Sequence, residues 1–269
     1  MKKHREMIFI TLLIVIMLVI LIPTLLGGIG PIPHGDIRPL AKAYLNSTFN
    51  IYIKDLWTAS PEAVAAIVWD YRGLDTFYET IVFYTAIVSC LILYREILGK
   101  RDISKGEGLS IVVKRVTAIS LLGILVVGAS TVLHGMLTPG GGFQGGAIMA
   151  VAPVIVIIVF SRLLVDTSRL SYSKVVTFRN LAILGIALTA LIPIILGFGN
   201  AFIFQNQYKR STNFSYPTYI FDVPMGGSLW FLNLFEGLAV FMAFYLAFNI
   251  ILYSEEVSKE VILGEEYGY

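Results

Sequence analysis

The sequence predicts an all-α integral membrane protein with about six transmembrane helices. Of its 269 residues, 57% are hydrophobic and only 14% are charged, and the mean hydropathy is +0.79. Soluble domains carry about 25% charged residues. In addition, the apolar residues gather in long runs, and a helix needs about 20 such residues to cross a bilayer. The helices are therefore expected to pack against one another in lipid.

Six apolar runs are long enough to span a membrane. They cover residues 7–26, 74–93, 116–133, 147–164, 181–198 and 229–252. The first run follows Lys2, Lys3 and Arg5, so it also fits the start of a signal peptide. Because the run is long and no small-residue cleavage site follows promptly, we interpret it as a retained helix.

The polar connection 27–74 contains one predicted helix outside the spans. The residues Ser60, Pro61 and Glu62 are typical of a helix start: an N-cap serine, a proline at the first helical position and an acid in the first turn. An apolar stripe follows, formed by Ala63, Val64, Ile67 and Val68. We expect a short amphipathic helix that lies on the membrane surface and ends near Asp70.

The basic residues predict the orientation and the domain division. Most of the 20 Lys and Arg residues fall in the N-terminal segment and in the connections 95–115 and 162–179. Cytoplasmic loops are enriched in these residues, so both termini are expected in the cytoplasm. The sequons at Asn46 and Asn213 then fall in outer loops. The charged stretch 95–115 separates two predicted modules, 1–100 with two spans and 101–255 with four, before an acidic tail, 256–269.

The segment 134–146 joins the third and fourth predicted spans and contains no Lys, Arg, Asp or Glu. A solvated loop of this length normally carries charge. Pro139 cannot continue a helix, and glycines spaced four residues apart allow another helix to approach closely. A tight turn with helix-packing glycines is the simplest interpretation, and a phosphate cradle is disfavoured because no G-K-[ST] follows. The motif comprises Pro139, Gly140, Gly141, Gly142, Gly145 and Gly146.

Four titratable side chains are candidates for an ion path, because ionisable groups in membrane spans are costly and often functional. Glu79 and Asp75 share a face near the start of the second span. They could transfer protons or bind Na⁺ through their oxygen atoms, and the alternative is an interfacial pair that caps the helix. Glu236 lies about 10 Å along the last span, among apolar residues. It serves either a proton relay or a bond to another helix. His134 borders the glycine-rich turn and is either structural or a group that titrates near neutral pH.

Other chemistry is disfavoured by composition. The single cysteine excludes a disulfide framework and a Cys-ligated cluster within this chain, and the three histidines are not closely spaced. The sequence contains no nucleotide motif, nucleophile elbow or H-E-x-x-H. We therefore expect no enzymatic activity from this chain by itself, and no cofactor or metal bound to it.

Three stretches resemble subunits of Mrp-type multisubunit cation/proton antiporters. The nine residues 138–146, Thr-Pro-Gly-Gly-Gly-Phe-Gln-Gly-Gly, resemble the motif of the B subunit. Residues 70–79 resemble the D-[FY]-R-G-x-D-T-x-G-E pattern of the C-terminal part of the A subunit, with Tyr78 in place of the usual Gly. The stretch 234–237, with Glu236, is similar to the last span of the B subunit, where the acid is usually Asp.

The resemblance implies an A-subunit tail fused to a B subunit, and it covers nearly the whole chain. Related modules occur in archaeal membrane-bound hydrogenase and sulfur reductase complexes. The implied function is that of an accessory subunit of a Na⁺/H⁺ translocation module in the cell membrane, with Na⁺ as the transported ion. The implied partners are Mrp-like and antiporter-like membrane subunits and a peripheral redox arm that carries Fe–S clusters. The alternatives are a scaffold subunit without an ion path, a subunit of a stand-alone Mrp antiporter, or an independent transporter.

Overall fold

The computed structural model confirms the all-α prediction. It describes residues 2–25, 37–50, 52, 56–95, 108–160, 172–197, 199–208, 212, 214–251, 253 and 259. Within these ranges, five helices are long and apolar enough to cross a membrane. They are α4 (Gly73–Leu93), α5 (Ile111–Leu133), α6 (Gly142–Phe160), α8 (Tyr172–Leu196) and α9 (Ser228–Ile251). The protein is thus a multi-pass membrane protein. Most of the acidic tail and the sequon at Asn213 lie outside the described residues.

Three of these helices, α5, α6 and α8, begin earlier than their apolar runs predict. The early start of α6 lies in the glycines of segment 134–146, and those of α5 and α8 lie in charged residues. The first turns of α5 contain Lys114 and Arg115, and those of α8 contain Lys174 and Arg179. These charges end a hydropathy run but do not interrupt the backbone hydrogen bonds of a helix. At the start of α5, the Ser110 hydroxyl caps the helix by accepting a hydrogen bond from the Val113 amide.

The chain divides into two compact units, Met1–Ala43 and Tyr44–Tyr269. The first contains α1 (Lys2–Leu25) and the start of α2 (Pro39–Thr48). The first predicted span therefore forms a helix, whose apolar part is the shorter stretch Ile10–Pro23. A sixth transmembrane helix remains a prediction, as do the division near residue 100 and the orientation of the termini.

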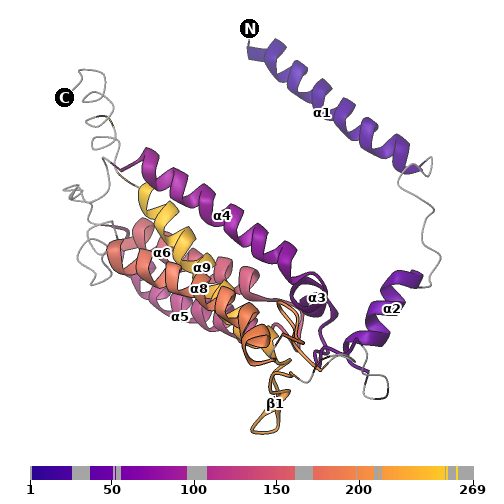
Figure 1. Cartoon of the computed structure of the whole chain (residues 1–269). Helices are drawn as coiled ribbons and strands as arrows, with labels where there is room; N and C mark the ends of the chain where they lie inside the picture. The colour runs from indigo at the N-terminus through magenta and orange to yellow at the C-terminus, as the bar shows by residue number, and fades with distance from the viewer. Residues whose placement is uncertain are drawn as a thin grey trace. The chain divides into compact units, whose positions relative to one another are not determined.

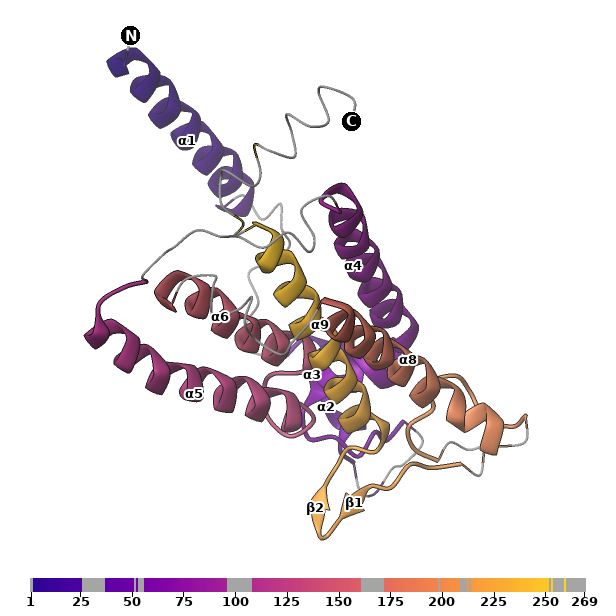
Figure 2. The same cartoon turned by 90° about the vertical axis from the view of Figure 1, so that its left-hand side faces the viewer.

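Helix α9 is the centre of the larger unit. It packs against α6 and α8 along most of its length and also contacts α4 and α5 (Figures 1 and 2). Its buried residues recur every three or four positions, as on one face of a helix. They include Leu229, Leu232, Asn233, Glu236, Val240, Ala243, Leu246 and Ile250.

The glycines of segment 134–146 allow the start of α6 to pack tightly between α5 and α9. A Cβ atom at Gly145 would lie 2.5 Å from the Gly128 carbonyl oxygen of α5, and one at Gly146 would lie 2.6 Å from the Gly237 carbonyl oxygen of α9. Both distances are shorter than any ordinary contact, so only glycine fits. Before the helix, Gly140 and Gly141 have φ angles of +152° and +151°, which disfavour other residues. In the structure this segment is thus a turn followed by glycines that pack against α5 and α9.

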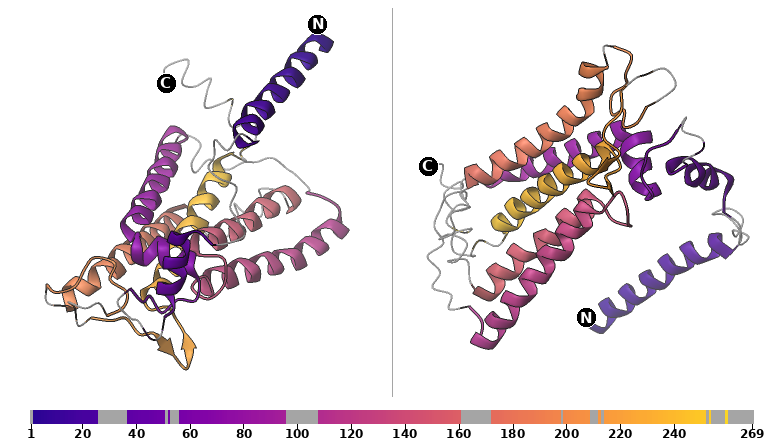
Figure 3. Two further views of the ribbon diagram at one scale, coloured as in Figure 1. Left: turned by 90° about the vertical axis from the view of Figure 1, so that its right-hand side faces the viewer. Right: turned by 90° about the horizontal axis from the view of Figure 1, so that it is seen from below.

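The predicted amphipathic helix differs from the structure in helix type and in buried face. It is a single α-turn, α3 (Ala63–Ala66), followed by a π-helical turn, η1 (Ile67–Tyr71), beside the start of α4 (Figure 3). Glu62, not the predicted Ser60, is the N-cap and accepts from the Ala65 amide. The buried side chains are Ala65, Ala66 and Trp69, whereas Val64 of the predicted stripe is exposed. Through this face the segment packs against α4 and α9.

A polar cluster closes the same end of the bundle. Asn206 is fully buried, and its amide donates hydrogen bonds to the Thr58 and Gly226 carbonyls, while its Oδ1 accepts from the Ser228 amide at the start of α9. A hairpin of β1 (Tyr219–Ile220) and β2 (Val223–Pro224) projects from this end (Figure 2). Its two turn residues have positive φ without being glycines, which explains why the sequence contains no hairpin signal.

Candidate functional site

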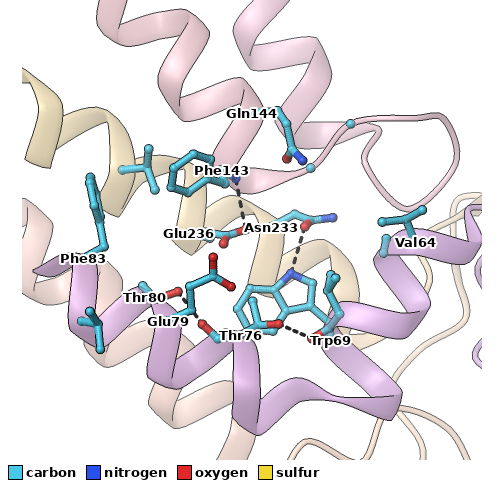
Figure 4. A pocket seen from close by; sticks show the side chains of 16 residues that line it. Val64, Trp69, Thr76, Glu79, Thr80, Phe83, Phe143, Gln144, Asn233 and Glu236 are labelled. Atoms are coloured by element: carbon cyan, nitrogen blue, oxygen red, sulfur yellow. Dashed lines mark hydrogen bonds between the residues drawn. The ribbon is translucent and has the colours of Figure 1, made fainter. Parts of the chain in front are cut away.

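A cavity of about 430 Å³ lies between η1, α4, the start of α6 and α9 (Figure 4). Each of these elements contributes to its wall, so it exists only in the packed bundle. The wall is mostly apolar and includes two carboxylates from different helices. The polar and acidic side chains that line it are Thr76, Glu79, Thr80, Gln144, Asn233 and Glu236.

Glu236 lies at the inner side of this cavity. It extends from the middle of the central helix α9 and is only 7% exposed. Its Oε2 accepts a hydrogen bond of 3.1 Å from the backbone amide of Phe143, in the first turn of α6. A carboxylate at this position also interacts favourably with the positive end of the α6 helix dipole. Glu236 therefore has a structural contact to α6 in addition to its place on the cavity wall.

Glu79 reaches the same cavity from α4. Its carboxylate points toward Glu236 (Figure 4), yet the side chain is exposed when this chain is considered alone. Within the described residues it makes no hydrogen bond or ion pair. It lies one turn after Thr76 and next to Thr80, whose hydroxyl donates to the Thr76 carbonyl. Glu79 is thus a carboxylate at the opening of the cavity that no hydrogen bond to the described part of the chain holds in place.

Asn233 and Trp69 belong to the site and were missed from the sequence. Asn233 precedes Glu236 by one turn of α9, and its Oδ1 accepts from the Trp69 indole N–H at 3.2 Å and from the Gly142 amide at 3.3 Å. The buried Nδ2 of Asn233 has no hydrogen-bond partner among the described residues. The sequence does contain a signal for Asn233 as a site residue. It lies three residues before Glu236, so the two polar side chains share one face of an apolar helix.

The π-helical turn explains how Trp69 reaches this site. The Arg72 amide bonds to the Ile67 carbonyl, five residues back, and the Thr76 hydroxyl donates to the Val68 carbonyl at 2.6 Å. The Trp69 side chain is consequently fully buried between α4 and α9. Such turns occur frequently at functional sites.

The structure places the other two candidates away from the cavity. Asp75 is exposed and forms an ion pair with Arg72, at 2.5 Å between Nη2 and Oδ2. It does not line the cavity, although it precedes Glu79 by one turn. His134 is exposed at the C-cap of α5, where its carbonyl accepts from the Leu137 and Thr138 amides. The cavity therefore brings together Glu79 and Glu236, but not Asp75 or His134.

The chemistry of this arrangement follows from two carboxylates that face one largely apolar cavity. Like charges in a medium of low dielectric repel strongly, so the pair favours a bound proton or cation between the two groups. Carboxylate, amide and hydroxyl oxygens are suitable ligands for a hard cation. In the described part of the chain, no group of three or more His, Cys, Asp or Glu side chains forms a metal site.

The fold and the site define a class of protein: a multi-pass membrane helix bundle with a paired-carboxylate cavity beside a glycine-rich turn. Residues 112–246 match the family described as a domain related to the MnhB subunit of Na⁺/H⁺ antiporters. The match covers half of the chain, and the chain belongs to this family. The resemblance inferred from residues 138–146 is thereby confirmed.

Two relatives are similar in sequence to part of this chain. An uncharacterized protein of Methanocaldococcus jannaschii is 32% identical over an alignment of 117 residues, and the match covers 37% of this chain and 44% of that protein. A protein of Staphylococcus haemolyticus described as antiporter subunit mnhB2 is 32% identical over 100 residues, which are 36% of this chain and 66% of that protein. The chain thus spans less than two thirds of the length of either relative.

Two solved structures share the fold over 92% of this chain. The first is the membrane-bound sulfane sulfur reductase, an archaeal respiratory membrane complex, with a TM-score of 0.67 and 24% identity over the whole of the matched chain. The second is the Mrp complex from Dietzia sp. DQ12-45-1b, with a TM-score of 0.64 and 15% identity over 26% of the matched chain. At these identities the comparison shows a common fold.

Proposed function

We propose that the chain is an accessory membrane subunit of a Mrp-type Na⁺/H⁺ translocation module in a multisubunit respiratory complex. Family membership supports the Mrp-type module, and the two structural neighbours, both multisubunit membrane complexes, support the assembly. The observation that carries an ion-conducting role is the meeting of Glu79 and Glu236 at one cavity inside the bundle.

In this proposal the two carboxylates have different tasks. Glu79, at the opening of the cavity, exchanges a proton or Na⁺ with the outside of the chain. Glu236, at the inner side, holds the ion in a place that excludes most water. An exposed acid on a membrane-spanning helix is costly in lipid, so Glu79 is expected to face a neighbouring subunit or a water-filled passage. Asp75 and His134 are weaker candidates, because neither lines the cavity.

The proposed partners are other Mrp-like membrane subunits and antiporter-like subunits in the cell membrane. A peripheral redox arm with Fe–S clusters would supply the driving reaction in a hydrogenase or sulfur reductase. This chain would contribute no catalytic residue to that reaction and would bind no cofactor itself.

A scaffold role is the second candidate, and a specific contact favours it. Glu236 bonds the Phe143 amide and Asn233 bonds the Gly142 amide, so both side chains hold α6 against α9. The variant Glu236→Gln separates the roles, because its amide oxygen can still accept from Phe143 while the side chain no longer carries a proton or a charge. Normal assembly with reduced transport favours an ion path; reduced assembly with normal transport in what remains favours a scaffold.

Mass spectrometry of the proteins that copurify with this chain from native membranes in mild detergent tests the proposed assembly. Antiporter-like subunits together with hydrophilic Fe–S subunits would support the respiratory complex and identify the redox partner. Antiporter-like subunits alone would indicate a stand-alone Mrp antiporter. A chain that purifies alone and stably folded would contradict the proposed assembly.

A further inference from the structure

Arg179 is a buried cation that has no anionic partner among the described residues, and it lies at the end of the bundle far from the glycine-rich turn. It lies in the second turn of α8 and is only 2% exposed. Its Nε and Nη1 atoms donate no hydrogen bond to any described residue. The guanidinium group lies over the Tyr84 ring of α4, 4.5 Å from its centroid. A ring face attracts a cation but does not accept the hydrogen bonds that a buried guanidinium requires.

The Arg179 side chain lines a groove of about 530 Å³ between α4 and α8. Arg95, at the exposed end of α4, also lines the groove, and there is no Asp or Glu among the described residues that line it. The Tyr84 hydroxyl donates to Asn180 at 3.4 Å, which leaves the Asn180 amide group to donate. The polar part of the groove therefore offers mainly donors and positive charge, as an anion-binding site does.

The remainder of the groove is apolar. Val88, Leu91 and Ile92 of α4 and Val176 of α8 line it, and Tyr172 stands at the start of α8. Arg179 is seven residues from Tyr172, about 10 Å along the helix axis, which is a suitable depth for a lipid headgroup near the end of a membrane helix. A ligand that fills this groove needs an anionic group and an apolar chain.

We propose that this groove binds one anionic phospholipid, whose phosphate accepts hydrogen bonds from Arg179 and whose acyl chain lies along the apolar wall. Arg is well suited to the phosphate because its planar fork of donors matches two phosphate oxygens. The lipid would also join α4 to α8, two helices that share few direct contacts. A protein carboxylate would satisfy Arg179 but would leave the apolar wall unfilled.

The test uses the full chain in whatever assembly mild detergent preserves. After removal of bound lipid, it is titrated with phosphatidylglycerol and the lipid adduct is measured by native mass spectrometry. We expect one phosphatidylglycerol per chain, and about tenfold weaker binding for Arg179→Gln, as the loss of charge-assisted hydrogen bonds implies. The control Arg115→Gln removes an exposed arginine of α5 that does not line the groove, and it should bind like the wild type.

A second variant keeps the charge and fills the groove. Val88→Trp should also weaken the binding of phosphatidylglycerol, and it decides the question if Arg179→Gln does not assemble. If Arg179→Gln binds phosphatidylglycerol as tightly as the wild type does, the proposal is wrong. If Arg179→Gln does not assemble, wild-type binding by Val88→Trp would overturn it instead. Displacement of the lipid by inorganic phosphate would overturn the lipid assignment in favour of a free anion. Failure of the wild type to bind phosphatidylglycerol would assign Arg179 to a protein carboxylate instead.

Discussion

Gly142 is the position at which a single methyl group should disturb the site most. A Cβ atom there would lie 2.5 Å from the Asn233 carbonyl oxygen, 2.6 Å from Glu236 Oε2 and 2.7 Å from Glu236 Cβ. Ordinary contacts between such atoms are about 3.5 Å or longer, so α6 and α9 must separate locally by roughly 1 Å. Gly142→Ala is therefore expected to open the joint between these two helices at the cavity.

The magnitude of the effect follows from two contributions. Overpacking of a well-packed core costs about 1–3 kcal/mol. The separation also weakens the hydrogen bonds from the Gly142 and Phe143 amides to Asn233 and Glu236, each worth about 0.5–1.5 kcal/mol or more for the charged acceptor. Together the free energy of unfolding should fall by roughly 2–5 kcal/mol, which for a chain of this size lowers the Tm by about 5–15 °C.

Thermal unfolding of the purified protein in detergent measures this shift. Gly123→Ala is the matched control, because Gly123 lies within α5 and a Cβ atom there meets nothing within 4 Å. Alanine is the better helix former, so the control should leave the Tm unchanged or raise it. Equal melting temperatures for Gly142→Ala and Gly123→Ala would refute the close packing of α6 on α9.

Three further predictions concern individual contacts. Asn233→Ala removes the acceptor shared by Trp69 and Gly142 and should lower the free energy of unfolding by about 2 kcal/mol. Trp69→Phe removes only one of the two donors and should lower it by about half as much. Chemical unfolding in detergent measures both changes. Asp75→Asn breaks an exposed ion pair and should change the stability by less than about 0.5 kcal/mol; a larger loss would mean that Asp75 has an unseen role. Burial raises the pKa of Tyr216 above its ordinary value of 10 to about 12. The neutral phenol therefore contributes to the free energy of unfolding below pH 10, and this contribution is lost as the pH rises to about 12. Protease cleavage of the loop before α9 should therefore increase over that pH range in the wild type, and less steeply in Tyr216→Phe.

The features that depend on local composition were predictable. Long apolar runs determine membrane spans, and five of the six predicted spans appear as helices that meet the length and hydropathy of a membrane crossing. The helix-packing role of the glycines also follows from their spacing, since Gly141 and Gly145 lie one above the other on any helix that begins there. The starts of α5 and α8 were misjudged because hydropathy does not detect the helical backbone beneath charged first turns.

The features that depend on packing between distant segments were not predictable. Glu79 and Glu236 were each selected as intramembrane acids, but nothing in a single sequence shows that α4 and α9 bring them to one cavity. Asp75 was linked to Glu79 by helical spacing alone, and Arg72, three residues before it, competes successfully for its carboxylate. Trp69 was overlooked because it lies, with Ala65 and Ala66, on the face opposite the predicted apolar stripe, and two alanines give little sign of a buried face.

Na⁺ transport by the Glu79→Gln variant tests the central claim most directly. Glu79 makes no hydrogen bond or ion pair within the described residues, so this substitution should leave the fold of this chain intact while it removes the charge at the cavity opening. The measurement is Na⁺ uptake into membrane vesicles that contain equal amounts of assembled complex, with Asp75→Asn as the control for loss of an acid from the same helix. If the cavity is part of an ion path, Glu79→Gln should slow uptake by at least about tenfold, as expected for loss of a proton-transfer group, and Asp75→Asn should not. Uptake at the wild-type rate by Glu79→Gln would contradict the assignment of this cavity to an ion path.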